Sequence, residues 1–88
     1  MSDTVAAPHG HVVFTEFEGD EGVLVDLNSK RYYTLNETAT LVWRALEKGH
    51  SKAEIVSQMT AAYDVTPERA AASIDALVSS LRSHHLLR

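Results

Sequence analysis

Cysteine is absent from this chain of 88 residues, and the chain has only two prolines and four glycines. The absence of cysteine excludes disulfide bonds, thiolate nucleophiles and zinc–thiolate or iron–sulfur sites. No apolar run approaches the roughly 18 residues that a membrane span requires. Residues 1–10 lack the basic start and apolar stretch of a signal peptide. We therefore expect a cytoplasmic protein without membrane contacts.

Basic residues are also few, since eight Lys and Arg stand against twelve Asp and Glu and the net charge is −4. Proteins that bind nucleic acids usually carry a surplus of basic residues, because neutralising phosphates supplies most of their affinity. We therefore expect no nucleic-acid partner. A chain of this length forms one domain with a modest core, which leaves little room for a deep substrate cavity. Its size argues against an enzyme.

The first part of the chain has the pattern of a β-meander. The segments 12–17, 23–27 and 30–35 are rich in β-branched and aromatic residues, which favour strands. Turn-forming residues separate them at 19–22 and 28–29. Short connections between consecutive strands predict an antiparallel sheet of three strands.

The rest of the chain has helical periodicity. Residues typical of helix starts are Asn36, Ser51 with Glu54 in a capping box, and Thr66 followed by Pro67. Gly49 is suited to end the first helix, and the second is expected to end near 63–64. The sequence therefore predicts an α+β domain over residues 11–88, with three strands followed by three helices, and a flexible tail over 1–10.

The third predicted strand, 30–35, contains neither proline nor glycine, and its only charged residues, Lys30 and Arg31, lie at its start. Outer strands of a sheet usually carry features that block pairing with another chain. An unblocked edge beside a helix suits the addition of a peptide as an extra strand. The alternative is an ordinary edge covered by a loop or by the N-terminal tail, and the pattern alone does not decide between the two.

Several segments resemble PqqD-like proteins, and they occur in the same order. They are Gly-Val-Leu-Val-Asp-Leu at 22–27, Arg-Tyr-Tyr-x-Leu-Asn-Glu-Thr-Ala at 31–39, Val-Trp-x-x-Leu at 42–46, Glu-Ile-Val at 54–56, Tyr-Asp-Val at 63–65, Ile-x-x-Leu-Val-x-x-Leu at 74–81 and Leu-Leu at 86–87. The resemblance extends over nearly all of the predicted domain.

The resemblance implies a winged-helix-like fold and a role as the recognition element for the leader peptide of a ribosomally made, later modified peptide. In such domains the leader adds to the third strand, in the groove beside the last helix. The sequence at 31–46 is most similar to that of free-standing proteins of lasso-peptide pathways, which pass the leader to a cysteine-type leader peptidase. The alternative is a peptide chaperone for a radical enzyme in the synthesis of pyrroloquinoline quinone or in another such pathway.

From the resemblance and the pattern together we predict a set of peptide-binding residues. Lys30, Arg31, Tyr32, Tyr33, Thr34 and Leu35 come from the third strand, and Ala71, Ile74, Asp75, Val78 and Arg82 from the last helix. Two positions depart from the family pattern. Ser73 replaces a frequent acidic residue, whose contact would be lost or shifted to Asp75. His85 replaces a frequent glycine, so we expect a strained helix end or a helix that runs on by a turn.

Other conspicuous residues are expected to be structural. Trp43 and Tyr33 are predicted to pack in the core, whereas Tyr32 points to the more open face. The histidine pairs 9/11 and 84/85 lack further ligands, and the acidic residues at 20, 21 and 26 have no nucleophile to serve. We therefore expect no metal, no cofactor and no catalytic residue.

Two other functions compete with peptide binding. The last two helices have the spacing of a helix-turn-helix, which would suit a winged-helix DNA-binding protein, although the acidic charge opposes it. A small enzyme or cofactor carrier has no supporting motif. A receptive edge can also pair with its own copy, so we expect a monomer or a weak edge-paired dimer.

Overall fold

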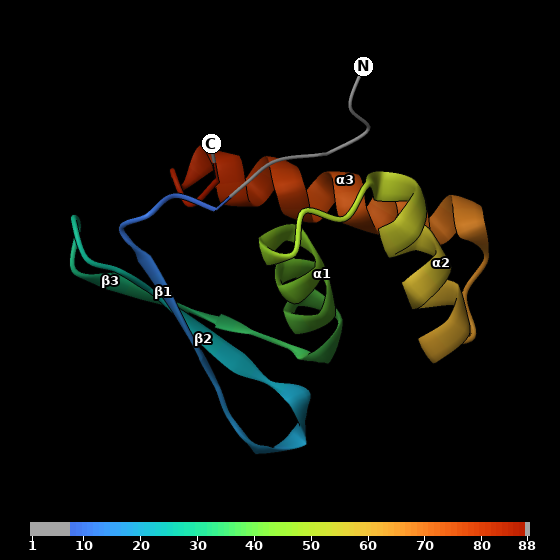
Figure 1. Ribbon diagram of the computed structural model, residues 1–88, viewed down its shortest axis with the longest axis horizontal. Coiled ribbons are helices and arrows are strands. Elements are labelled where there is room, and N and C mark those ends of the chain that lie inside the picture. Colours follow the sequence, from blue (N-terminus) through green and yellow to red (C-terminus); the bar gives the residue numbers. More distant parts are fainter. Residues whose placement is uncertain (1–7, 88) are drawn as a thin grey trace.

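The computed structural model describes residues 8–87, which form an antiparallel sheet of three strands followed by three helices (Figure 1). The strands are β1 (Val12–Glu16), β2 (Gly22–Asp26) and β3 (Arg31–Leu35), arranged in the order β1-β2-β3. The helices are α1 (Glu37–Glu47), α2 (Lys52–Ala62) and α3 (Pro67–Ser83), and a short turn, η1 (Glu18–Asp20), joins β1 to β2. The predicted fold class and order of elements are confirmed.

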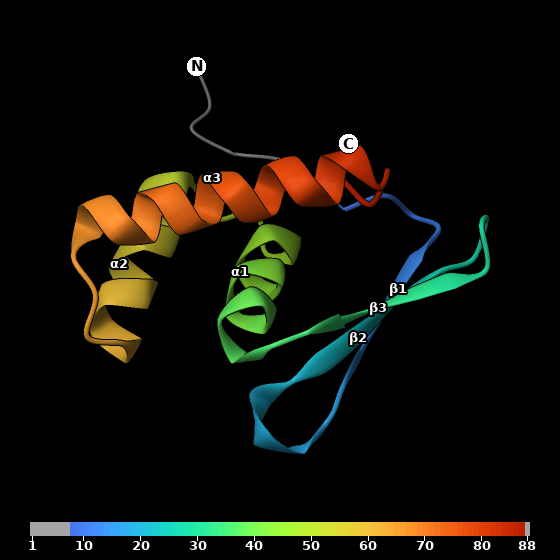
Figure 2. The same ribbon diagram turned by 180° about the vertical axis from the view of Figure 1, so that it is seen from behind.

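Helix α3 is the longest element and crosses both other helices (Figures 1 and 2). Its N-terminal part lies beside α2, and its C-terminal end reaches toward the sheet. Within residues 8–87 no helix combines the length and hydrophobicity that crossing a membrane demands. The arrangement brings the end of α3 near β3, although the two elements are far apart in the sequence.

The core lies between α1, α2, α3 and the face of the sheet that points toward the helices, which we call the inner sheet face. Its buried apolar residues are Leu24, Leu35, Val42, Trp43, Ala45, Leu46, Ile55, Met59, Ala70, Ile74, Val78, Leu81, Leu86 and Leu87. Trp43 is 1% exposed and Tyr33 packs against this cluster, as predicted. Burying each large apolar side chain contributes about 1.5–3 kcal/mol, and this packing holds the helices on the sheet.

The predicted helix caps are all present. The Asn36 side chain accepts a hydrogen bond from a backbone amide of the first turn of α1, and Thr66 does the same for α3. The Ser51 hydroxyl accepts from the Glu54 amide at 3.2 Å, while the Glu54 carboxylate accepts from the Ser51 amide at 2.9 Å. This last bond holds the pKa of the Glu54 carboxyl below its usual value. The helix boundaries therefore follow from local chemistry.

The N-terminal end of the described chain lies against its C-terminal end. Pro8 forms an isolated antiparallel bridge with Leu87, and the His9 amide donates to the Leu86 carbonyl at 3.2 Å. The flexible tail predicted for residues 1–10 lies mostly outside the described residues, because the structure describes only 8–10 of it.

Helix α3 ends in a Schellman motif that has histidine where glycine is usual. The Leu86 amide donates to the Leu81 carbonyl, and the His85 amide donates to the Arg82 carbonyl. His85 adopts a left-handed φ of 58°. The same motif ends α1, but there the left-handed residue is Gly49, with a φ of 76°. Of the two outcomes expected for His85, the strained helix end is the one found.

The turn between β2 and β3 is organised by the buried Asp26. Its carboxylate accepts hydrogen bonds from the amides of Asn28 at 2.9 Å and Ser29 at 3.2 Å, and His11 lies 3.7 Å away. Burial works to raise the pKa of Asp26, but these amides and His11 together hold the pKa of its carboxyl below its usual value. The ionised form therefore stabilises the turn that leads into β3.

His85→Gly should raise the free energy of unfolding by about 1 kcal/mol, because glycine takes the left-handed conformation without a side-chain penalty. The measurement is urea unfolding at neutral pH, with Gly49→Ala as a matched control that should lose stability. A His85→Gly protein no more stable than the wild type would contradict the assignment of strain to this residue.

Acid should weaken the fold partly through Asp26. Because its pKa is lower in the folded state, its stabilising effect is complete above the unfolded pKa of about 3.9 and is lost as the pH falls through the folded pKa. The urea midpoint of the wild type should therefore fall between about pH 6 and about pH 3, and that of Asp26→Asn should fall less. An equal fall of the urea midpoint with pH in the two proteins would contradict this role of Asp26.

Candidate functional site: the free edge of β3 and its groove

The hydrogen-bond pattern of the sheet shows which residues of β2 bond to β1. The Leu27 amide donates to the His11 carbonyl at 2.9 Å, and the Phe17 amide donates to the Glu21 carbonyl at 2.7 Å. These bonds continue the register of β1 and β2 by one residue at each end. Backbone groups of successive residues point to opposite sides of a strand. The odd-numbered residues of β2 therefore bond to β1, and the even-numbered ones bond to β3.

The same alternation identifies the free backbone groups of β3. The even-numbered residues of β2 are partnered by Arg31, Tyr33 and Leu35, which bond inward to the sheet. Tyr32 and Thr34 therefore direct both their N–H and their C=O groups away from β2. Because β3 is the last strand of the sheet, no other strand of residues 8–87 pairs with these groups, and we call this side of β3 its free edge.

A groove of about 400 Å³ runs between β3 and the C-terminal end of α3. Its lining residues are Tyr33, Thr34, Leu35 and Asn36 from β3 and the α1 cap, Ala39 from α1, Leu77, Ser80, Leu81 and His84 from α3 and its end, and Leu86. The strand edge and the groove are therefore adjacent, which is the arrangement that strand addition requires.

The groove has an apolar floor and uncharged polar walls. Leu35, Leu81 and Leu86 are buried beneath it, and Leu77 is half-buried at its side. The Tyr33 ring meets the His84 ring edge to face, with centroids 5.1 Å apart, and so links the strand to the helix end. No Asp, Glu, Lys or Arg lines it. The apolar floor and the absence of charged side chains in the lining suit the apolar side chains of a guest peptide.

The strand residues of the predicted site lie together at this edge. Tyr33, Thr34 and Leu35 line the groove. Lys30, Arg31 and Tyr32 are exposed beside it, at the start of β3 and on its other face. Tyr32 is 72% exposed, whereas Tyr33 is half-buried, in agreement with the predicted division between the two tyrosines.

The helix residues of the predicted site lie elsewhere. Ile74 and Val78 are 0% and 5% exposed and belong to the core. Asp75 faces α2, where its carboxylate bonds to the Lys52 ammonium at 2.7 Å. Ala71 and Arg82 do not line the groove either. The five predicted residues of the last helix therefore lie outside this groove, because packing on the other helices takes up Ile74, Asp75 and Val78, and their part in peptide binding stays a prediction.

The groove residues that the sequence-based set missed are Asn36, Ala39, Leu77, Ser80, Leu81, His84 and Leu86. Leu77 and Leu81 belong to the apolar stripe of the last helix, so the stripe could have indicated these two groove residues. Polar Ser80 and His84 lie one turn apart on the same side of α3, which hydrophobicity alone does not reveal.

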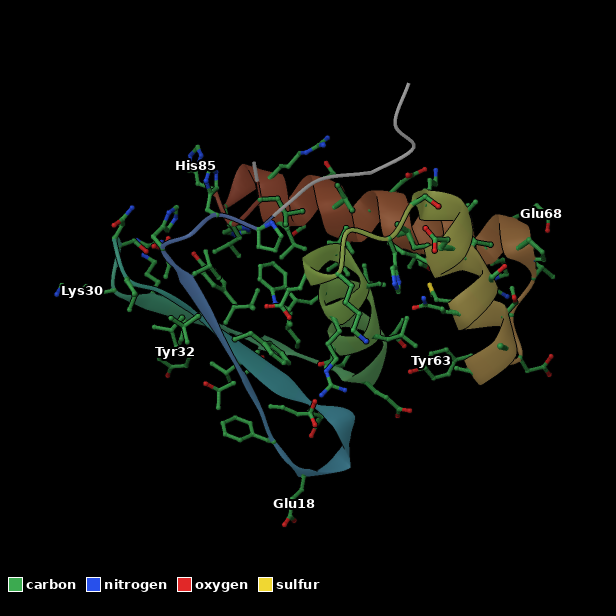
Figure 3. The ribbon with its side chains drawn as sticks, in the orientation of Figure 1. Glu18, Lys30, Tyr32, Tyr63, Glu68 and His85 are labelled. Atoms are coloured by element: carbon green, nitrogen blue, oxygen red, sulfur yellow. The ribbon has the colours of Figure 1, made fainter. Side chains whose placement is uncertain are left out.

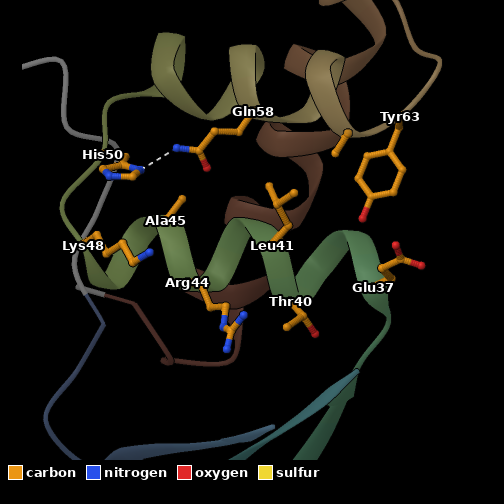
Figure 4. Close-up of a pocket in the computed structure, with 10 residues that line it drawn as sticks. Glu37, Thr40, Leu41, Arg44, Ala45, Lys48, His50, Gln58 and Tyr63 are labelled. Carbon is orange, nitrogen blue, oxygen red and sulfur yellow. Dashed lines mark hydrogen bonds between the residues drawn. The ribbon is translucent and has the colours of Figure 1, made fainter. Parts of the chain in front are cut away.

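A second cleft, of about 380 Å³, lies between α1 and α2 (Figure 4). Its walls are more polar, and the His50 ring bonds to the Gln58 amide at 2.7 Å. Arg44, at its rim, forms an ion pair with Glu16 of β1. None of the residues that line this cleft belongs to a strand. Within residues 8–87 no three His, Asp or Glu side chains are grouped closely enough to hold a metal ion.

Comparisons with known proteins give a family and two solved structures. Residues 21–87 match the family model described as coenzyme PQQ synthesis protein D (PqqD). A search of curated proteins finds no match. A solved structure of TbiB1 in complex with the TbiA(beta) leader peptide is similar, with 27% identity and a TM-score of 0.87 over 93% of this chain and 94% of that one.

The second structure is a lasso peptide synthetase B1 complexed with the leader peptide. It shares 29% identity with this chain, the alignment covers 99% of each, and the TM-score is 0.85. Both similarities extend over almost the whole chain, so the comparison includes β3, α3 and the groove between them.

Proposed function

Because the chain belongs to the PqqD family, we propose that it binds the leader peptide of a ribosomally made precursor, by adding the leader as a fourth strand to β3. The observation that carries this proposal is the free backbone of Tyr32 and Thr34 beside an uncharged groove. Both similar structures are complexes with leader peptides, which supports the same class of ligand here.

The free edge and the groove together suffice for a useful affinity. Tyr32 and Thr34 offer about four backbone hydrogen bonds, each worth roughly 0.5–1.5 kcal/mol net. Two or three apolar anchors in the groove add about 1.5–3 kcal/mol each, before the cost of ordering the peptide. A net value near −8 kcal/mol corresponds to a dissociation constant of about 1 μM.

We propose that the protein is a non-catalytic adaptor, which raises the local concentration of precursor at a maturation enzyme. The similarity to lasso peptide synthetase B1 favours a cysteine-type leader peptidase as that enzyme. A radical enzyme of pyrroloquinoline quinone synthesis is the alternative, which the description of the matched family favours. We place this function in the cytoplasm, where ribosomes make the precursor.

Thr34→Pro should abolish leader binding and leave the protein folded, because proline removes an N–H that points to the free edge and is tolerated on edge strands. Binding of a fluorescein-labelled leader peptide is measured by polarisation, and folding by circular dichroism. Thr34→Ala, which keeps the N–H, should bind within about threefold of the wild type. Tyr33→Pro should lose the fold, since the Tyr33 backbone bonds to β2. Wild-type affinity in Thr34→Pro would contradict strand addition at this edge.

Leu77→Ala should weaken leader binding about tenfold, since it removes apolar contact equivalent to about 1.4 kcal/mol from the groove wall. Asp75→Asn, on the α2 side of α3, should leave leader affinity unchanged. Calorimetric titration with the same leader peptide measures both. The reverse pattern, with loss only in Asp75→Asn, would place the leader on the other side of the helix.

A further inference from the structure

The sheet has a second surface, on the face that points away from the helices, and of its residues only Thr34 also lines the leader groove. In an antiparallel sheet, directly paired residues share a face, and the faces alternate along each strand. The register therefore places nine residues on one face of the sheet. They are 11, 13, 15 and 17 in or next to β1, 23, 25 and 27 in or next to β2, and 32 and 34 in β3. We call these nine positions the outer sheet face, because the helices pack on the other side.

The outer sheet face holds every large hydrophobic residue that is exposed within residues 8–87. These residues are Val13 at 44%, Phe17 and Leu27 at 55% and Tyr32 at 72%. Figure 3 shows the Tyr32 side chain pointing away from α1 and α3. The hydrogen bonds of Phe17 and Leu27 to the neighbouring strand hold these two residues in the sheet. The exposed apolar residues therefore form one surface and are not scattered.

The distribution of charge on the sheet is the reverse of the usual one. A sheet with one solvated face normally has polar or charged residues on that face. Here none of the nine outer positions is Asp, Glu, Lys or Arg. The charged strand residues Glu16, Asp26 and Arg31 have the parity of the inner sheet face. Exposed apolar residues that gather on one uncharged sheet face suit a contact with another molecule.

The size of the surface argues against a stable dimer of this chain. Three strands of five residues make a surface about 17 Å long and about 14 Å wide, or roughly 240 Å². A stable dimer buries about 800 Å² on each partner. The outer sheet face is therefore too small to hold a second copy firmly. A leader strand on β3 would widen it by about a third and add its own outward side chains.

The outer sheet face is continuous with the leader edge, because Tyr32 and Thr34 belong to both. Charged residues lie at its two ends, where Figure 3 shows Glu18 in the β1–β2 connection and Lys30 just before β3, and Glu21 adds a second acidic residue to the first of these ends. A partner would therefore need an apolar centre, with basic residues facing the first turn and acidic residues facing the second.

We propose that the outer sheet face is the docking surface for the maturation enzyme, which binds the protein and the bound leader together as one four-stranded sheet. This inference rests on the proposed function, since the leader supplies the fourth strand. The enzyme binds weakly to the protein alone and more tightly once the leader is in place. The face thereby couples delivery of the precursor to recruitment of the enzyme.

The test uses the full chain, its leader peptide and the purified cysteine-type leader peptidase proposed above. The double variant Val13→Lys/Phe17→Lys places two charges on β1, away from the β3 edge. The double variant Ala61→Lys/Ala72→Lys adds the same charge at exposed positions of α2 and α3. Peptidase binding is measured by biolayer interferometry with and without saturating leader, and leader affinity is measured by polarisation.

We expect the β1 variant to lose peptidase affinity by about tenfold or more, to keep its leader affinity and to remain folded. The helix variant should bind both partners as the wild type does, and leader should strengthen peptidase binding to the wild type. Unchanged peptidase affinity in the β1 variant would overturn the proposal, as would a leader that weakens the complex. Sedimentation that shows a wild-type dimer disrupted by the β1 variant would assign the face to a second copy. Failure of the wild type to bind leader would contradict the proposed function instead.

Discussion

Along β3, the direction of the backbone hydrogen-bonding groups and the direction of the side chains both alternate from one residue to the next. The proposed function depends on the fact that the two alternate together. Tyr33 and Leu35 turn their backbone groups toward β2 and their side chains toward the helices. Tyr32 and Thr34 turn their backbone groups to the free edge and their side chains to the outer sheet face. The residues that offer hydrogen bonds to a leader therefore also form the surface beside it. A shift of one residue in register would exchange both roles at once.

Helix α3 supplies the second wall of the groove because its two halves have different neighbours. Its first half lies along α2, where Asp75 pairs with Lys52. Its last turns lie near β3, where Leu77, Leu81 and His84 face the strand. The left-handed His85 then turns the chain so that Leu86 returns beneath the groove. The strained residue His85 therefore lies at the point where the helix has to end so that Leu86 can form part of the groove lining.

The sequence predicted most of the fold because its signals are local. Caps at Asn36, Ser51 and Thr66 mark the helix starts, and runs of β-branched and aromatic residues between turns mark the strands. The α3 side of the groove was not predictable in the same way. Ile74 and Leu77 belong to one apolar stripe, yet the first lies in the core and the second lines the groove. Only the packing of α3 on its neighbours decides which part of the stripe stays open. The outward direction of Tyr32 and Thr34 also required the register.

Amide hydrogen exchange with and without the leader shows whether a leader peptide becomes the fourth strand of the sheet at β3. When the leader binds, exchange at Tyr32 and Thr34 should slow by about tenfold or more, whereas Tyr33 and Leu35 are already protected by β2. A bound leader that leaves Tyr32 and Thr34 unprotected, or that protects β1 in their place, would contradict the addition of the leader at β3.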